Sequence, residues 1–132
     1  MATLDDVRRL ALALPEAYED TSREGLAFWR VNKKLFVWER PLRKSDLTHF
    51  STIGEEPPRG MILGARVPGE TAKLALVTSQ PEIYFTIPHF NGYPAVLVRL
   101  DRIDLGELEE VVTEAWLDRA PAKLAKTFLG RG

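Results

Sequence analysis

Two short apolar segments, separated by only two residues, constrain the fold of this chain more than any other feature. Residues 26–31 and 34–39 are rich in aromatic and β-branched side chains, which favour extended strands. Asn32 and Lys33 lie between them, and Asn tolerates the positive φ angle that a tight hairpin turn requires. The pattern therefore predicts a β-hairpin over residues 26–39.

This predicted hairpin is apolar on both of its faces. A two-residue turn pairs Trp29 with Phe36 and Phe28 with Val37. Because side chains alternate along a strand, one face then holds Trp29, Phe36 and Trp38. The opposite face holds Leu26, Phe28, Leu35 and Val37. We expect the face with Trp29, Phe36 and Trp38 to contact a ligand or a second copy of the chain, with burial in the core as the alternative.

The rest of the chain alternates between helix and strand patterns. Thr3 with Asp6 and Asp104 with Glu107 are N-cap signals for the first and last long helices. Helices are predicted at residues 4–14, 70–79 and from 105 to the break at 120–121, and further strands at 61–67, 82–87 and 95–100, with 41–60 mostly loop. The order α-β-β-β-α-β-β-α predicts one α+β domain over residues 1–132. We expect a two-layer sandwich with an antiparallel or mixed sheet and helices on one face.

Charge is distributed unevenly along the chain, although the net charge is only −1. Residues 23–44 include seven basic and two acidic side chains, whereas residues 101–118 include seven acidic and one basic. Phosphate groups favour a basic strip, so this segment supplies candidate nucleic-acid contacts: Arg30, Lys33, Lys34, Arg43 and Lys44. In the alternative interpretation these side chains are simply solvated and protect an edge strand. The near-zero net charge argues against a strong, dedicated nucleic-acid binder.

The segment 88–94 combines a histidine, two aromatic residues and an amide between two prolines. Prolines at both ends restrict the backbone, which suits a recognition loop. Its candidate contact residues are His89, Phe90, Asn91 and Tyr93. The alternative is a turn whose Phe90 and Tyr93 fold back onto the core. Trp116, on the apolar stripe of the last helix, is predicted to pack in the core.

Several classes of function are not indicated by the sequence. The chain has no Cys, and its two histidines, His49 and His89, lack the spacing of zinc motifs. Gly-rich phosphate loops and a Gly-x-Ser-x-Gly motif are absent from the sequence, so we predict no metal, cofactor or catalytic residue. An enzyme would need a pocket that pairs His89 with a carboxylate. The short apolar runs and the charged first helix argue against a membrane span or signal peptide, so we expect a cytoplasmic protein.

Several segments together resemble one known family. Residues 88–100 resemble the most characteristic stretch of the MmcQ/YjbR family, residues 114–116 and 120–123 resemble its C-terminal end, and residues 14–15 and 27–36 resemble its start. The resemblance covers nearly the whole chain. It implies a two-layer α+β fold related to frataxin-like and secretion-chaperone-like architectures. It also implies DNA binding through a double-wing arrangement of hairpins.

Two functions from different classes fit these observations. The first is weak, non-specific DNA binding, in which the basic hairpin contacts phosphates, the 89–93 loop enters or straddles a groove of the DNA, and the acidic last helix faces away. The second is a module that binds a protein or a small molecule on the open apolar sheet face, as a homodimer in one version. The long 41–60 segment is fuller than the shortest family pattern, which leaves the position of a wing near it open.

Overall fold

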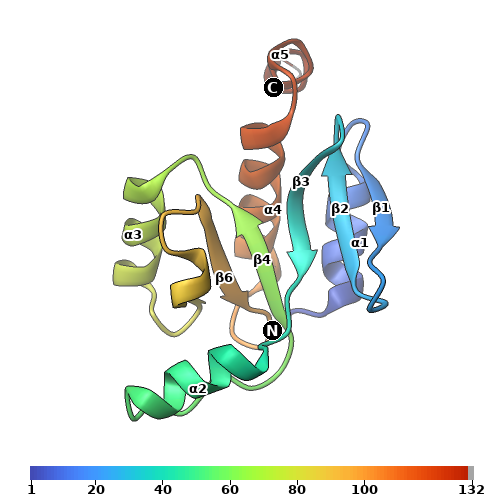
Figure 1. The fold of residues 1–132 in the computed structure, drawn as a ribbon. Coiled ribbons are helices and arrows are strands. Elements are labelled where there is room, and N and C mark those ends of the chain that lie inside the picture. Colours follow the sequence, from blue (N-terminus) through green and yellow to red (C-terminus); the bar gives the residue numbers. More distant parts are fainter. Residues whose placement is uncertain (131–132) are drawn as a thin grey trace.

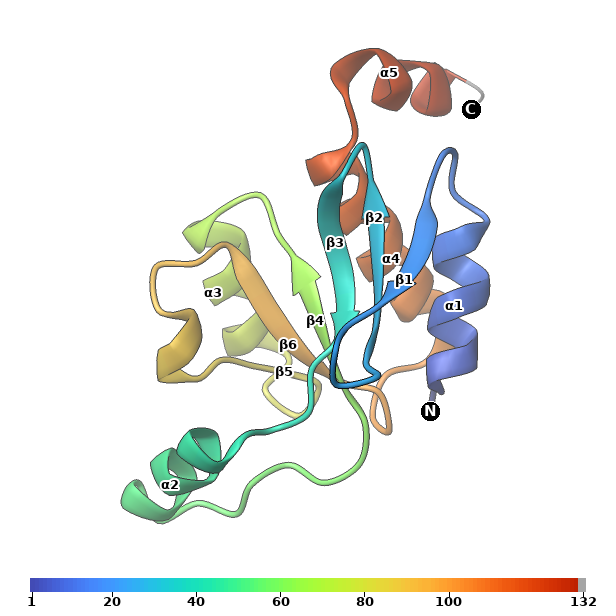
Figure 2. The ribbon, with the colours of Figure 1, turned by 45° about the vertical axis from the view of Figure 1, so that its right-hand side comes forward.

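The computed structural model describes residues 1–130 and shows a six-stranded antiparallel sheet packed against helices (Figures 1 and 2). The strands are β1 (Tyr18–Thr21), β2 (Ala27–Val31), β3 (Lys34–Glu39), β4 (Ile62–Arg66), β5 (Tyr84–Phe85) and β6 (Ala95–Arg99). They pair in the order β1-β2-β3-β4-β6-β5. The helices are α1 (Leu4–Leu12), α2 (Lys44–Thr52), α3 (Glu70–Ser79), α4 (Leu105–Arg119) and α5 (Ala122–Gly130), with a short 3-10 turn, η1 (Pro88–Phe90). The predicted α+β class is confirmed.

The predicted helix starts are also present. The Thr3 hydroxyl accepts the Asp6 N–H at 3.2 Å, and the Asp6 carboxylate accepts the Thr3 N–H at 2.9 Å, which forms a capping box at α1. Asp104 accepts the Glu107 N–H at 2.8 Å at the start of α4. The longest helix, α4, has 15 residues, and among residues 1–130 no helix is both long and apolar enough to cross a membrane.

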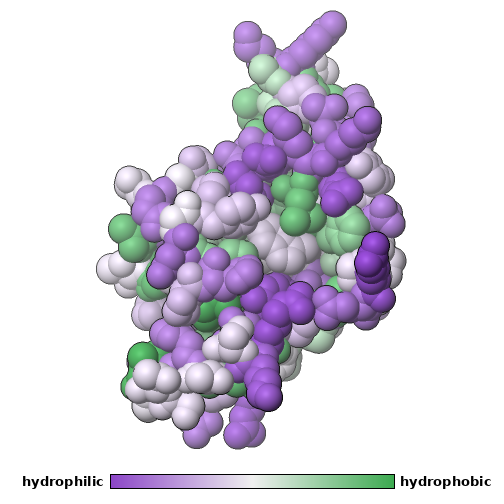
Figure 3. Space-filling model, in the orientation of Figure 1, coloured by the Kyte–Doolittle hydropathy of each residue, from purple (hydrophilic) through white to green (hydrophobic). Residues whose placement is uncertain are grey.

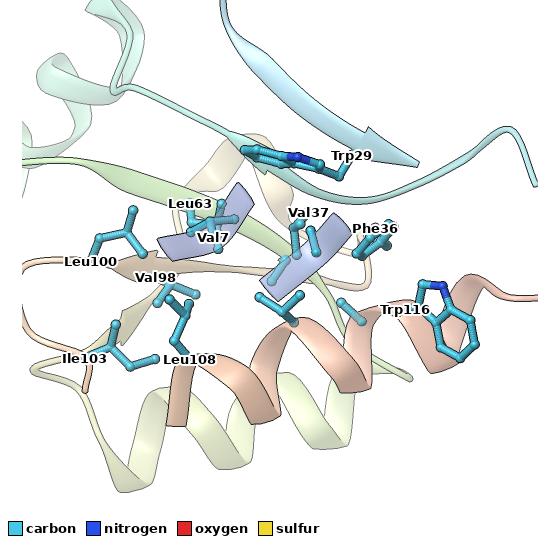
Figure 4. Packing of buried hydrophobic residues seen from close by; sticks show 14 of the residues in the cluster. Val7, Trp29, Phe36, Val37, Leu63, Val98, Leu100, Ile103, Leu108 and Trp116 are labelled. Atoms are coloured by element: carbon cyan, nitrogen blue, oxygen red, sulfur yellow. The ribbon is translucent and has the colours of Figure 1, made fainter. Parts of the chain in front are cut away.

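Helices α1, α3 and α4 cover one face of the sheet, and α4 runs behind β3 and β4 in Figure 1. Figure 4 shows the core on this side, with Leu63 and Val98 from the sheet and Leu108 and Trp116 from α4. All four side chains are 0% exposed, and full burial of an apolar side chain contributes about 1.5–3 kcal/mol. The Trp116 indole N–H donates to the Pro15 carbonyl at 3.1 Å. The predicted core position of Trp116 is confirmed.

The hairpin turn forms as predicted, but its two strands pair in a different register from the predicted one. Asn32 and Lys33 have φ angles of 51° and 64°, as a two-residue turn requires. Beyond the turn, Trp29 pairs with Val37 rather than with Phe36. Phe36 is therefore an extra residue in β3, and the strand contains a β-bulge.

The bulge changes which aromatic residues share a face of the sheet. Phe36 and Val37 both lie in the helix-side core with Trp29, and all three are 0% exposed (Figure 4). The prediction that Trp29, Phe36 and Trp38 line one open face is therefore wrong. Trp38 lies on the opposite side of the sheet, where it pairs with Phe28. Two of the three proposed partner-face residues are core residues.

A second, smaller core lies on the face opposite to α4. It contains Phe50 from α2, Phe90 from η1, and Ile62, Ile87, Ala95 and Leu97 from the sheet and its loops. Helix α2 interrupts the segment predicted as loop, so that prediction is wrong for Lys44–Thr52. Helix α2 and η1 cover β4 and β6 on this face. Within residues 1–130, no helix covers the β1–β3 part of this face (Figure 2).

Two strands also differ from the sequence prediction. β1 was not predicted, because Tyr18–Thr21 is mostly exposed and lacks an apolar alternation. β5 comprises only Tyr84–Phe85, since residues 82–83 of the predicted strand 82–87 form a turn and residues 86–87 are irregular. Both differences lie at the edges of the sheet, where one side of the strand has no neighbour to hold it.

Candidate functional site

A groove lies on the part of the sheet face that α2 and η1 leave uncovered. It is a hollow of ≈ 570 Å³ between the β2–β3 hairpin and the 88–94 loop. Its apolar and aromatic lining includes Leu26, Phe28, Leu35, Trp38, Phe90 and Tyr93, and its charged lining includes Glu24, Arg30, Glu39, Arg40 and Arg43. Figure 3 shows apolar surface near the centre of this face, bordered by hydrophilic residues. The volume lies within the range of typical ligand pockets, roughly 300–1,000 Å³.

Aromatic side chains form a continuous wall of the groove. Trp38 pairs with Gly64 of β4, and a Cβ atom on Gly64 would lie 2.3 Å from Cε2 of the Trp38 indole. The indole therefore lies directly over the glycine backbone. The Phe90 ring centroid is 6.3 Å from that of Trp38 and 5.9 Å from that of Tyr93. Strand β3 and the 88–94 loop thus supply one aromatic surface.

Two of the groove arginines are engaged in ion pairs. Arg43 lies 3.3 Å from Glu24, and both side chains are exposed. Arg40 is 5% exposed, and its Nη1 lies 3.1 Å from the carboxylate of the equally buried Asp46. Asp46 also accepts the Arg43 N–H at 2.8 Å, at the start of α2. The buried pair therefore ties α2 to the end of β3, while Arg40 Nη2 has no hydrogen-bond partner within residues 1–130.

The third arginine of the groove is not neutralised in this way. Arg30 pairs with Leu35 across the hairpin, so both side chains are on the groove face. Its guanidinium carbon lies 4.7 Å from the centroid of the Phe28 ring, a cation–π contact. Within the described residues Arg30 forms no ion pair, and its Nε is buried without a hydrogen-bond partner. The groove therefore offers a cation that is still able to receive an anion.

The 88–94 loop is held from beneath by a buried lysine. Lys73 on α3 is 2% exposed, and its ammonium group donates to the carbonyls of Phe90 at 2.6 Å and Tyr93 at 3.0 Å. Phe90 is 6% exposed in the second core, whereas Tyr93 is 38% exposed. The Tyr93 hydroxyl accepts a hydrogen bond from Arg66 at 3.0 Å. Of the two aromatic residues expected in this loop, one packs inward and the other forms the rim of the groove.

His89 lies on the exposed side of the same loop. Its ring stands edge-on to Phe90, with 4.9 Å between the ring centroids. Among residues 1–130, no group of three His, Asp or Glu side chains is arranged to hold a metal ion.

The structure brings together only some of the residues that the sequence proposed. Arg30, Arg43, Trp38, His89, Phe90 and Tyr93 line the groove. Lys33, Lys34, Lys44 and Asn91 are exposed outside it, the two lysines 33 and 34 at the hairpin tip. Arg40, Gly64 and Lys73 were not among the site residues predicted from the sequence. A glycine inside a strand pattern is a known sign of close approach by another group, so Gly64 carried a usable signal.

A second hollow, of ≈ 470 Å³, lies between α3 and α4 on the other side of the sheet. Within it the Tyr84 hydroxyl donates a hydrogen bond to the Glu107 carboxylate, and the Gln80 side-chain amide donates to the same oxygen at 2.9 Å. Burial, followed by the adjacent Glu107 carboxylate, raises the pKa of Tyr84 well above the usual value of 10.0. Tyr84 therefore remains protonated in the folded protein at pH values where an exposed tyrosine ionises.

This arrangement predicts a loss of stability in alkaline solution. Above pH 10 the unfolded chain releases the Tyr84 proton while the folded chain keeps it, so raising the pH favours unfolding. We expect Tyr84 to lower the free energy of unfolding by about 1.4 kcal/mol per pH unit above that point. Urea unfolding between pH 8 and 11 measures the free energy of unfolding, and Tyr84→Phe should reduce its dependence on pH. Tyr18→Phe, at an exposed position, is the control, and equal pH profiles of Tyr84→Phe and the unchanged protein would refute the prediction.

Comparisons with known proteins find relatives of this chain both in sequence and in fold. The YjbR family model matches residues 12–117. The uncharacterized protein Rv2570 of Mycobacterium tuberculosis is 52% identical over 129 residues, covering 98% of this chain and 97% of the relative, and Mb2600 of Mycobacterium bovis matches equally. The crystal structure of the Deinococcus radiodurans protein DR2400, a DUF419 domain, shares the fold with a TM-score of 0.67, 19% identity, and coverage of 98% of this chain and 89% of that one. This chain therefore belongs to the YjbR family.

Proposed function

We propose that the protein is cytoplasmic and binds nucleic acid weakly, with little base preference, through the groove face of its sheet. The observation that carries the proposal is the meeting of Arg30, Trp38 and the 88–94 loop in one groove. These groups are far apart in the sequence. A groove with one arginine outside any ion pair of the described residues and with aromatic walls suits a nucleic-acid strand, because a cation binds the backbone and aromatic rings stack with bases.

The distribution of charge over the two layers supports this orientation. The acidic residues Glu109, Glu110 and Glu114 are exposed on α4, which lies on the face opposite to the groove. Lys33 and Lys34 are exposed at the tip of the hairpin that forms one wall of the groove. Nucleic acid approaching the groove face would therefore meet the basic side of the protein and avoid the acidic side. In this proposal the hairpin and the 88–94 loop correspond to the two expected wings.

The recessed shape of the groove favours an unpaired strand over a duplex. Stacking on Trp38 requires an exposed base face, which a duplex presents only at its ends. The wide duplex could contact only the lysines of the hairpin tip and the rim residues. We therefore expect single-stranded DNA to bind more tightly than duplex DNA of the same length.

The double variant Lys33→Glu, Lys34→Glu tests the electrostatic part of the proposal. Each lysine that contacts a phosphate contributes about 1 to the slope of log affinity against log salt concentration. We therefore expect the double variant to lower the slope by about 2 and the affinity for a random single strand by about ten-fold or more at low salt. Fluorescence anisotropy at two salt concentrations measures both effects.

The matched control is Arg9→Glu with Arg102→Glu, which makes the same change in net charge at exposed positions on α1 and after β6. It should leave binding nearly unchanged. Absence of binding to single strands and duplexes even at low salt would overturn the proposal. If the protein then sediments as a dimer, the apolar groove face with Phe28 and Leu35 is a self-association surface instead.

A further inference from the structure

The groove contains a flat aromatic platform whose position is set by the backbone. Trp38 has Gly64 as its cross-strand partner, and the absence of a Cβ atom there lets the indole lie against β4. Trp38 is half-buried and lines the groove, so the ring face away from β4 is left for a ligand. A fixed indole of this kind loses little conformational entropy when a second flat ring stacks on it.

An arginine without an ion pair lies on the same groove face as this platform. Arg40 is not that residue, because its side chain is 5% exposed and paired with Asp46, and its unpartnered Nη2 atom is itself buried within residues 1–130. Arg30 lines the same groove, and its Nε is likewise without a partner in the described part of the chain. Because Arg30 forms no ion pair in the described residues, its guanidinium can pair with the phosphate of a ligand in the groove.

We infer that the groove binds one nucleotide unit, with the base stacked on Trp38 and the phosphate held by Arg30. The hollow of ≈ 570 Å³ is of the size that takes a small organic ligand. The inference rests on the proposed function, because that function is the reason for choosing a nucleotide among the aromatic anions. Its consequence is that a free mononucleotide binds without any neighbouring nucleotides.

Tryptophan fluorescence offers a selective readout of this site. Trp29 and Trp116 are both 0% exposed, so Trp38 is the tryptophan that a ligand in the groove can reach. We expect adenosine 5′-monophosphate to quench the fluorescence, whereas ribose 5-phosphate and inorganic phosphate should not. Adenosine should quench with an affinity at least about ten-fold lower, since it lacks the group that Arg30 binds.

Substitutions distinguish the contribution of stacking on Trp38 from that of the charge on Arg30. Trp38→Phe should still bind the nucleotide in calorimetry but lose the fluorescence response, and Trp38→Leu should weaken binding by about ten-fold or more, since stacking requires a π face. Arg30→Gln should weaken binding of the monophosphate but not of adenosine. Arg9→Gln on α1 is the control. Circular dichroism identifies any variant that fails to fold. If Trp38→Leu does not fold, Trp38→Phe still tests whether the fluorescence response comes from Trp38.

The outcomes distinguish this inference from the proposed function. If a single strand binds and Trp38→Leu weakens that binding, but the monophosphate does not quench, the nucleotide site is wrong and the proposed function stands. If the monophosphate binds while single strands and duplexes do not, the nucleotide site stands and nucleic-acid binding is wrong. If neither ligand binds at low salt, both are overturned.

Discussion

Gly64→Ala is expected to displace Trp38 from the groove and to weaken ligand binding by about ten-fold or more, through loss of the stacking surface. The new Cβ atom would lie 2.3 Å from the indole, a separation that two carbon atoms do not tolerate. Gly64 is in β4, a central strand with neighbours on both sides, so the backbone has little freedom to move away. The indole must move instead, and overpacking of this kind costs about 1–3 kcal/mol.

Two measurements check this prediction. Urea unfolding should show the loss of stability, and the Trp38 fluorescence should shift to longer wavelength as the ring moves into solvent. Gly106→Ala in α4 is the matched control, since its Cβ atom meets only an ordinary contact, 3.5 Å from Asp104. Native stability together with an unchanged fluorescence spectrum in Gly64→Ala would show that Trp38 does not lie over β4 as described.

Local signals in the sequence were sufficient for the hairpin turn and for the starts of α1 and α4. The Asn32-Lys33 turn and the caps at Thr3 and Asp104 depend on residues within three or four positions of each other. Their geometry is nearly independent of the rest of the protein. The α+β class follows from the order of such elements, and the sequence was therefore a good guide to it.

The β-bulge could not be predicted from the same local signals. The alternation of residues 34–39 is compatible with a regular strand, which would put Trp38 on the same face as Trp29. The bulge places Phe36 and Val37 together in the helix-side core. That preference depends on the space left by α4, which is about seventy positions further along the chain. A one-residue change in register was therefore enough to misplace part of the proposed ligand face.

Helix α2 was missed for a similar reason. It lies in a long polar stretch, residues 41–60, with Pro57-Pro58 and two glycines, which suggested a loop. The helix is held by Phe50 in the second core and by the buried pair of Arg40 and Asp46. Such contacts override a weak local preference. The groove depends on this helix, because α2 and η1 define where the sheet face is covered.

The candidate site was predictable as separate pieces but not as one surface. The sequence identified the basic hairpin and the 88–94 loop, and the structure shows that both form walls of the groove. Their meeting depends on the strand order, in which β3 lies two strands from β6. Lys33 and Lys34 were proposed on charge alone, and they lie at the hairpin tip outside the groove. Their contribution remains a prediction that the charge-reversal variant tests.

Lys73→Met is expected to release the 88–94 loop and to lower the free energy of unfolding by about 2 kcal/mol. The change keeps the length of the side chain but removes the ammonium group that donates to the Phe90 and Tyr93 carbonyls. A net hydrogen bond to a charged group contributes about 1.5–3 kcal/mol, and part of that loss is offset because a buried cation is no longer desolvated. The Phe90 carbonyl also accepts the Tyr93 N–H at 3.0 Å and the Pro88 carbonyl accepts the Asn91 N–H at 3.0 Å, so the loop keeps these internal bonds.

We expect the Lys73→Met change to act locally on the 88–94 loop and the groove, which distinguishes Lys73 from an ordinary core residue. Without Lys73 the loop is no longer tied to α3, so Phe90 and Tyr93 shift relative to Trp38 and the groove widens. Hydrogen exchange at residues 89–93 should become faster while exchange in α4 changes little, because α4 packs in the other core. Lys126→Met, at an exposed position on α5, controls for loss of one positive charge. Uniformly faster exchange across both cores would instead assign Lys73 to the stability of the whole fold.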